Sequence, residues 1–215
     1  MRSHLSSVLT TLFLASLVVA GCSTDKPTRL YRLTAAVAQP VSASTQGVAI
    51  GVGPITLPKY LDRPQMVTGV SGNQMAQANF DQWGGELNDN MTRVLASNLS
   101  NLLGTDQVSL YPWTDQASVN YQVAIDVTQF EQDTDGRTVL SAFWSILDPK
   151  DGHPLIRRRS AYRDSGTVPP VTATSAEVGA QGGADGYDAI AAAMSRDLAA
   201  LSRDIAAAIA ALKTS

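Results

Sequence analysis

A strict two-residue alternation in the middle of the chain limits the fold more than any other feature. Apolar side chains recur at every second position from Val119 to Val127, and polar or small residues fill the positions between them. This period places alternate side chains on opposite faces of an extended strand, so one face is expected to be buried. Phe130 breaks the parity, which predicts a β-bulge near Thr128 or Gln129.

Further strands are expected on both sides of this segment. Turn residues at 133–136 and 148–154 separate it from strands at 137–147 and 155–164, which predicts an antiparallel meander. Shorter strands are expected at 29–33, 48–52, 66–70, 74–80 and 107–111. Proline lacks an amide donor, so Gly53-Pro54 is expected to end the strand at 48–52. Trp144 shares the parity of Leu140 and Ile146 and is expected in the core.

Two helices complete the predicted fold. From Trp83 to Leu103 the apolar period lengthens to three and four residues, which indicates an amphipathic helix that Gly104 ends as a left-handed cap. A second, alanine-rich helix is expected from about Asp185 to the end of the chain. The prediction is an α+β fold, a two-layer sandwich with a mostly antiparallel sheet and two long helices packed on one face. Residues 29–215 are expected to form one domain, with 34–47 as an exposed loop and 165–186 as a mobile loop.

The N-terminal 22 residues have the layout of a secretory signal. Arg2 precedes an apolar run from Val8 to Ala20, which is too short to span a bilayer as a permanent helix. Residues 19–22, Val-Ala-Gly-Cys, resemble a bacterial lipobox, and Cys22 is the only cysteine, so no disulfide can form. We therefore expect 1–21 to be a lipoprotein signal peptide, Cys22 to be lipidated, and 22–28 to be a short tether. The residue after Cys22 is Ser23 and not the aspartate typical of lipoproteins retained at the inner membrane, so we expect the chain at the periplasmic face of the outer membrane.

Composition argues against several function classes. Removing residues 1–21 removes Arg2 and no acidic residue, which leaves 15 basic and 19 acidic side chains. A nucleic-acid partner needs a basic surface, so none is expected. His4 is removed with the predicted signal peptide, and His153, the other histidine, lies in a predicted turn. The remaining histidine and cysteine side chains are too few for histidine-based catalysis or for a histidine–cysteine metal site. We expect no enzyme activity, no metal and no cofactor.

At residues 57–65, Leu-Pro-Lys-Tyr-Leu-Asp-Arg-Pro-Gln, the chain resembles the ABC-type transport auxiliary lipoproteins of the PqiC (YmbA) family. Residues 31–33, 83–99, 140–144 and 193–206 agree with the family in the same order, whereas 165–186 departs from it. The resemblance implies a non-enzymatic lipoprotein that accompanies an MCE-domain periplasmic channel protein and its inner-membrane partner. Such a protein would hold the outer-membrane end of a phospholipid conduit.

Two groups of residues are candidate partner-binding sites. The first is Tyr60, Leu61, Asp62, Arg63 and Pro64. Turn chemistry alone explains these residue types, but arginine and tyrosine are also enriched at the centres of protein interfaces.

The second group is Arg157, Arg159 and Arg163, which would share one face of a strand, with Arg158 on the other face. Charges of this kind often guard an edge strand. The alternative is a contact with anionic headgroups or with an acidic rim of the channel protein.

Two functions follow as hypotheses. The first is an anchoring and docking subunit for an MCE-type transport assembly. The second is a lipoprotein that carries a lipid or another hydrophobic molecule itself, which would require an apolar cavity of several hundred cubic ångströms. The sequence leaves open whether the chain contacts phospholipid and whether it forms a homo-oligomer.

Overall fold

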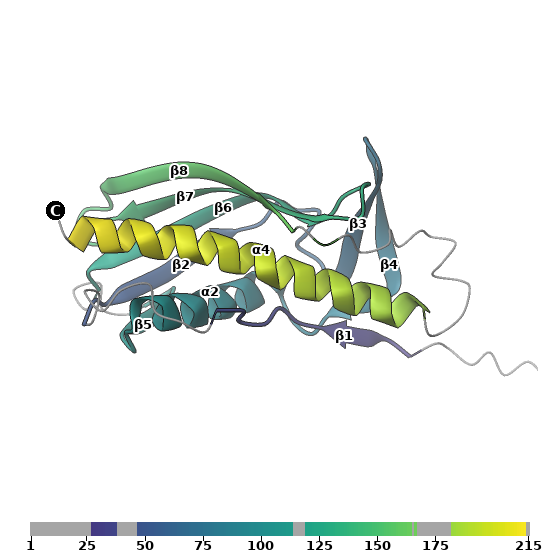
Figure 1. Cartoon of the computed structure of the whole chain (residues 1–215), viewed down its shortest axis with the longest axis horizontal. Coiled ribbons are helices and arrows are strands. Elements are labelled where there is room, and N and C mark those ends of the chain that lie inside the picture. The colour runs from purple at the N-terminus through teal and green to yellow at the C-terminus, as the bar shows by residue number, and fades with distance from the viewer. Residues whose placement is uncertain (1–26, 38–46, 114–118, 165, 167–181, 214–215) are drawn as a thin grey trace, which may run out of the picture.

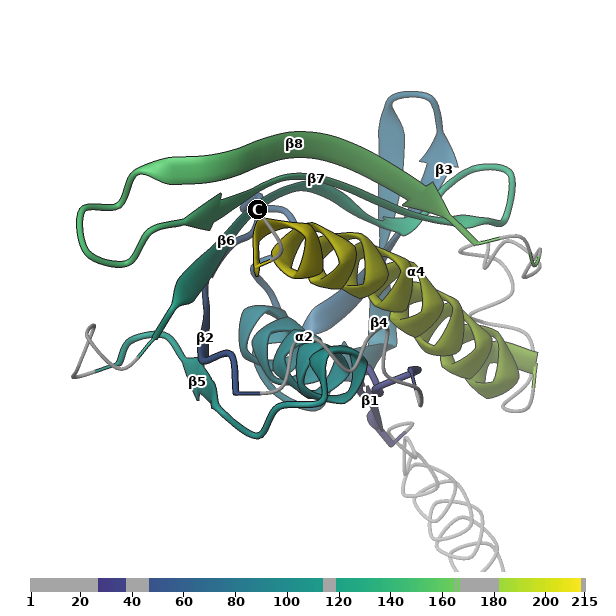
Figure 2. The same cartoon turned by 60° about the vertical axis from the view of Figure 1, so that its left-hand side comes forward.

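The computed structural model describes residues 27–37, 47–113, 119–164, 166 and 182–213. Within them the strands form a curled sheet, and both helices lie on its concave side (Figures 1 and 2). Chain order is β1 (Arg29–Tyr31), β2 (Ile50–Thr56), β3 (Gln65–Ser71), β4 (Gln74–Trp83), α2 (Leu87–Leu103), β5 (Val108–Leu110), β6 (Tyr121–Gln132), β7 (Thr138–Leu147), β8 (Pro154–Arg163) and α4 (Gly182–Lys213). Cys22 and the expected signal peptide lie outside the described residues.

The sheet is mixed, so the expectation of a mostly antiparallel sheet is not confirmed. The meander is antiparallel as predicted, because short turns join β6 to β7 and β7 to β8. The hairpin of β3 and β4 is antiparallel as well. In contrast, β2 pairs in parallel with both β5 and β6, and β1 pairs in parallel with β4. The chain passes through α2 between β2 and β5, and a helical crossover of this kind returns a strand in the same direction.

Two irregularities adjust the strands to the core. The register between β6 and β7 shifts between Val127 and Gln129, which confirms the predicted bulge and leaves Phe130 fully buried. A second shift lies between Val52 and Ile55, where β2 continues past Pro54 instead of ending there. The missing amide of Pro54 is tolerated because it lies in the interrupted part of the ladder.

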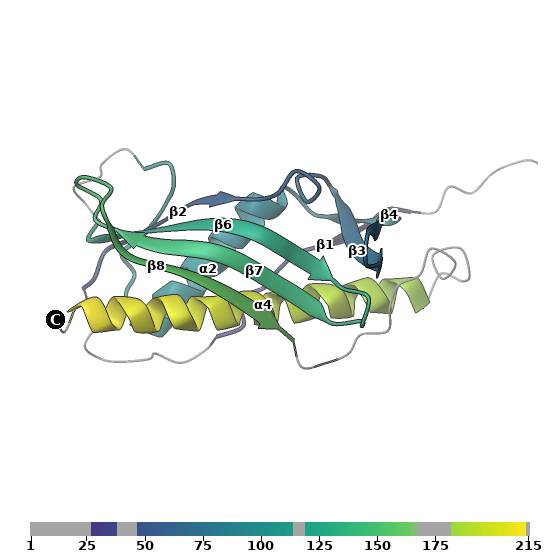
Figure 3. The same cartoon turned by 90° about the horizontal axis from the view of Figure 1, so that it is seen from above.

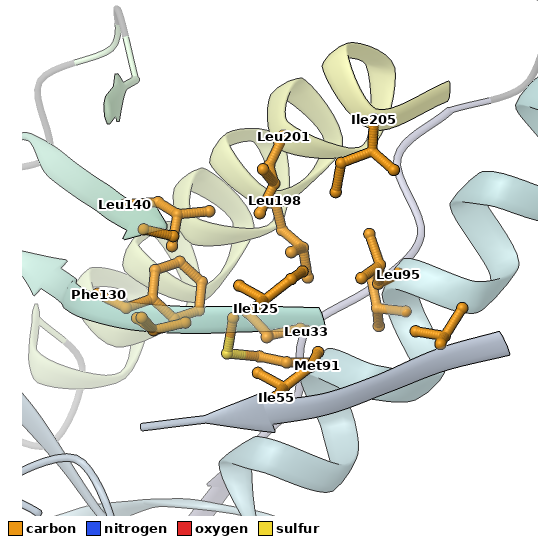
Figure 4. Close-up of a cluster of buried hydrophobic side chains, with 14 of the residues drawn as sticks. Leu33, Ile55, Met91, Leu95, Ile125, Phe130, Leu140, Leu198, Leu201 and Ile205 are labelled. Carbon is orange, nitrogen blue, oxygen red and sulfur yellow. The ribbon is translucent and has the colours of Figure 1, made fainter. Parts of the chain in front are cut away.

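The core fills the space between the sheet and the two helices. Figure 4 shows side chains of α2, α4 and the strands meeting there, and Trp144 is 1% exposed, as its parity predicted. Gly104 caps α2 in the left-handed conformation with φ of 60°. Two predicted helix starts were wrong. Trp83 ends β4, and α2 begins only at Leu87; residues 182–186, which were expected in the loop, already belong to α4.

Side chains of both helices hold the segment that follows β1, part of which was expected to be an exposed loop. The bonds run from Leu33 N to Asn90 Oδ1 (2.6 Å), from Thr34 N to Ser195 Oγ (3.1 Å), from Ala36 N to Asn98 Oδ1 (3.2 Å) and from Asn101 Nδ2 to Val37 O (3.2 Å). These side chains replace a neighbouring strand as hydrogen-bond partners, because they bind backbone N–H and C=O groups that are not paired within the sheet. Seen from above, α4 runs along β7 and β8 for much of the length of the molecule (Figure 3).

Candidate functional site

The segment from Leu57 to Pro64 connects β2 to β3 and folds into a turn. Leu61 N donates a hydrogen bond to Pro58 O at 2.9 Å, and Trp83 N at the end of β4 donates to Pro64 O at 2.7 Å. The Leu61 side chain is buried, whereas Asp62, Arg63 and Pro64 are exposed. Backbone bonds thus fix the turn and leave its charged side chains available on the surface.

This turn and the residues before α2 enclose a surface pocket of about 390 Å³. Its lining is Leu57, Leu61, Asp62, Arg63, Pro64, Trp83, Gly85, Glu86 and Leu87, which we call the turn pocket. In its apolar part Leu61, Trp83 and Leu87 are buried, Leu57 is half-buried and Pro64 is exposed. The charged residues of the lining are exposed. An apolar hollow with a few charged groups around it is suited to receive an apolar side chain and to orient its polar neighbours.

Arg63 and Tyr60 have different surroundings. The Arg63 guanidinium is exposed and donates from Nη1 to Gln77 Oε1 at 2.8 Å, and it has no acidic partner within the described residues. The Tyr60 hydroxyl donates to Glu131 Oε2 at 2.8 Å, and Glu131 is only 6% exposed. Burial raises the pKa of Tyr60 above its usual range. Tyr60 therefore fastens the turn to β6, while Arg63 points a charge outward.

The arginines of β8 lie where their parity predicted. Arg157, Arg159 and Arg163 pair with residues on the outer face of β7, and Arg159 lies over the ring of the exposed Phe143 at 5.7 Å. Arg158 is on the opposite face, 5.7 Å from the ring of Trp144. Arg163 forms ion pairs with two aspartates of the β6–β7 turn, so it differs from Arg157 and Arg159.

The arginines and the turn pocket belong to separate surfaces. Arg157 lines a hollow of about 380 Å³ on the outer face of the sheet, together with Pro54, Asp126 and Phe143. No residue is shared between this hollow and the turn pocket. The two candidate sites predicted from the sequence, the turn at residues 60–64 and the β8 arginines, therefore lie on different surfaces of the molecule.

The described part of the chain gives little support for a metal site, a histidine-based site or a membrane-spanning helix. There, no group of three or more histidine, cysteine, aspartate or glutamate side chains is placed to hold a metal ion. His153 is exposed in the β7–β8 turn, where its amide donates to Asp151 Oδ1. No helix among the described residues has both the length and the apolar character needed to cross a bilayer.

Comparison with known families decides the classification. Residues 31–206 match the family described as the ABC-type transport auxiliary lipoprotein component. The chain belongs to this family. The match contains both the turn pocket and the β8 arginines, and it identifies the chain as a lipoprotein component associated with ABC-type transport.

Solved structures share the fold of this auxiliary lipoprotein. A protein of the DUF330 family from Xanthomonas campestris is 16% identical with a TM-score of 0.58, and the alignment covers 82% of this chain and 92% of that one. An uncharacterised protein is 19% identical with a TM-score of 0.56, over 86% of this chain and 97% of that one. The search of curated proteins found no match.

Sequence reasoning missed the part of the turn pocket that lies between β4 and α2 in this auxiliary lipoprotein. Trp83, Glu86 and Leu87 line it, yet the apolar spacing had placed Trp83 at the start of a helix. The glycine pair at 84–85 was the available signal, because Gly85 has φ of 151°, which side chains rarely adopt. Two glycines after a tryptophan favour the end of one element and a sharp turn before the next.

Proposed function

We propose that this chain is an outer-membrane lipoprotein, anchored at Cys22 with its domain in the periplasm, that docks an MCE-type phospholipid transport complex. In this role it is a non-catalytic accessory subunit. Its partners are the MCE-domain channel protein and, through that protein, the inner-membrane part of the transporter. The turn pocket carries the proposal, because the segment that most resembles the family also forms a surface hollow with an exposed arginine that has no acidic partner among the described residues.

The chemistry of the turn pocket suits a protein contact. Leu61, Trp83 and Leu87 form a largely buried floor, and the half-buried Leu57 and the exposed Pro64 provide apolar surface that a partner side chain could cover. Arg63 can form charge-assisted hydrogen bonds once the partner excludes water, and such bonds are stronger than those between neutral groups. Arginine beside a tryptophan-lined pocket is a frequent composition at the energetic centre of an interface. We place the main contact with the channel protein here.

The carrier hypothesis receives less support. A carrier needs a continuous apolar cavity, but large side chains fill the layer between the sheet and the helices, with Phe130, Leu140 and Leu198 fully buried. The hollows described above are lined by exposed as well as buried residues. We assign Arg157 and Arg159 a secondary contact with anionic groups, either lipid headgroups or acidic residues of the channel protein.

Reversing the charge at the turn pocket tests the docking role. We expect Arg63→Glu to leave folding intact, because the side chain is exposed, and to weaken capture of the MCE-domain protein by about 2 kcal/mol, the scale of an interface hot spot. Capture would be measured by co-purification of the lipidated full chain with its partner. Arg203→Glu, an exposed arginine on α4, is the matched control. Equal capture by the two variants would remove the turn pocket as the docking site.

A further inference from the structure

The β3–β4 hairpin projects from the body of the molecule (Figures 1 and 2). One residue pair, Thr68 with Gln132, joins β3 to the end of β6. Gly69 lies beside the β6–β7 turn, where a Cβ atom would come within 3.3 Å of Gln132 O. The close approach at Gly69 fixes the base of the hairpin, and residues 70–75 form a tip beyond it.

The tip has an unusual composition for a projecting surface element. No charged residue occurs between Arg63 and Asp81. Val70 and Met75 at the tip are 44% and 43% exposed, although both are large apolar side chains. Residues 71–74 between them are glycine or polar and uncharged, and only a charged side chain would be costly to place at a bilayer surface. An uncharged tip with two exposed apolar side chains and polar residues between them is therefore compatible with the headgroup region of a membrane.

The tip lies within reach of the proposed anchor along the chain. Strands β1 and β4 are parallel and Arg29 pairs with Asp81, so the chain before Arg29 and the chain before Asp81 leave the pair at the same end. Cys22 is seven residues before Arg29, and Gln74 is seven residues before Asp81. Seven extended residues span at most about 25 Å, so the anchor and the tip can reach one membrane plane together. Leu30 in β1, 67% exposed, lies at this end of the molecule too.

Charges next to the tip oppose a membrane contact only weakly. Asp133 and Asp135 in the neighbouring turn form ion pairs with Arg163 at 2.7 and 3.4 Å. Glu131 is buried and accepts the hydroxyl of Tyr60. Arg163 thus compensates one of the two aspartate charges and Glu131 is withdrawn from the surface, so the acidic groups next to the tip leave about one negative charge exposed, which salt screens beyond about 10 Å.

We propose that the hairpin tip, residues 70–75, rests in the headgroup region of the membrane that holds the lipid anchor. This inference rests on the anchor at Cys22 in the proposed function. A lipid anchor alone leaves the domain free to rotate, whereas a second contact fixes its orientation. Arg63 is hydrogen-bonded to Gln77 of β4, so a hairpin fixed at its tip would also fix the direction in which the turn pocket faces.

A single fluorescent label tests the contact. The thiol of lipidated Cys22 is blocked, so Met75→Cys provides the free thiol for an NBD label in the full lipidated chain. Leu110→Cys is the matched control, because Leu110 is 42% exposed and belongs to β5, far from the hairpin (Figure 1). Both proteins are reconstituted into phosphatidylethanolamine–phosphatidylglycerol vesicles that carry a nitroxide in the headgroup region.

We expect a blue shift and strong quenching of the label at position 75, and neither at position 110. Equal emission and quenching at the two positions, in protein that floats with the vesicles, would overturn the membrane contact and leave the docking role untouched. A label at 75 that responds only when the partner protein is added would show a protein contact and would also overturn it. Failure of the chain to float would overturn the anchor itself, and this inference with it.

Discussion

Replacing Asp197 with asparagine is expected to stabilise the protein at pH 8 by about 2–4 kcal/mol. Asp197 is on α4, is 2% exposed and bonds to the Oγ1 atom of the fully buried Thr138 of β7 at 2.6 Å. Burial raises the pKa of Asp197 to about 7, and the nearby charge of Asp164 acts in the same direction, while Thr138, Arg196 and Arg163 oppose it. Asparagine has nearly the same shape and stays neutral at every pH.

The direction of the effect follows from proton linkage. Between the unfolded pKa of 3.8 and the folded pKa of about 7, the folded protein keeps a proton that the unfolded chain has lost. The free energy of unfolding therefore falls as pH rises through this range and levels off above it. Each pKa unit corresponds to about 1.4 kcal/mol, so the full effect is on the order of 4 kcal/mol.

Urea unfolding at several pH values measures this effect. The difference between Asp197→Asn and the wild type should be small at pH 4, where the acid is neutral in the folded protein, and largest at pH 8. The comparison of the variant with the wild type at pH 4 is the internal control for any change in packing. A difference that stays constant from pH 4 to pH 8 would show that Asp197 is not the group that titrates.

Asp81→Asn is expected to lower the free energy of unfolding by about 2–4 kcal/mol, because it breaks an ion pair whose carboxylate is buried. Asp81 is 3% exposed and accepts two bonds from the Arg29 guanidinium, at 2.7 and 2.8 Å, and one from the Tyr31 hydroxyl. Asparagine has one oxygen in place of two and no charge. The loss falls on β1, the strand nearest the proposed anchor, so hydrogen exchange should increase first at residues 29–31.

The control for Asp81 is Asp89→Asn on α2. Its ion pair with Arg93 is 3.9 Å long, and both side chains are more than half exposed. Exposed pairs at this spacing contribute only about 0.3–0.5 kcal/mol, so the variant should unfold almost like the wild type. If both variants lost the same small amount of stability, the Asp81 cluster would not be what holds β1 to the sheet.

Local patterns predicted most elements, but not the pairing of the strands. The alternation in β6, the bulge before Phe130 and the apolar stripe of α4 depend on side chains close together in sequence. The parallel pairing of β2 with β5 and β6 depends on where α2 returns the chain, which no local period encodes. The predicted strand end at Pro54 was wrong for a related reason, because only the partner strand determines whether an amide donor is needed at that position.

The candidate site was predictable in part. The residues from Tyr60 to Pro64 stood out, yet sequence could not show that Tyr60 is bound to Glu131, 71 residues away, whereas Arg63 is exposed. Nor could it place Trp83 against the turn, since this contact forms when β4 returns beside β3. The role of the α2 asparagines that bind residues 33–37 was not predicted, because polar residues in a helix usually face solvent.

Site-specific photocrosslinking in cells tests the docking role most directly. A photoreactive amino acid at Asp62, at the exposed edge of the turn pocket, would be compared with one at Arg203 on α4. Both positions are exposed, so neither replacement should unfold the protein. We predict a strong crosslink from position 62 to the MCE-domain partner and none from position 203. A crosslink to this partner from position 203 alone would contradict the account, because the partner would then bind another face of the molecule.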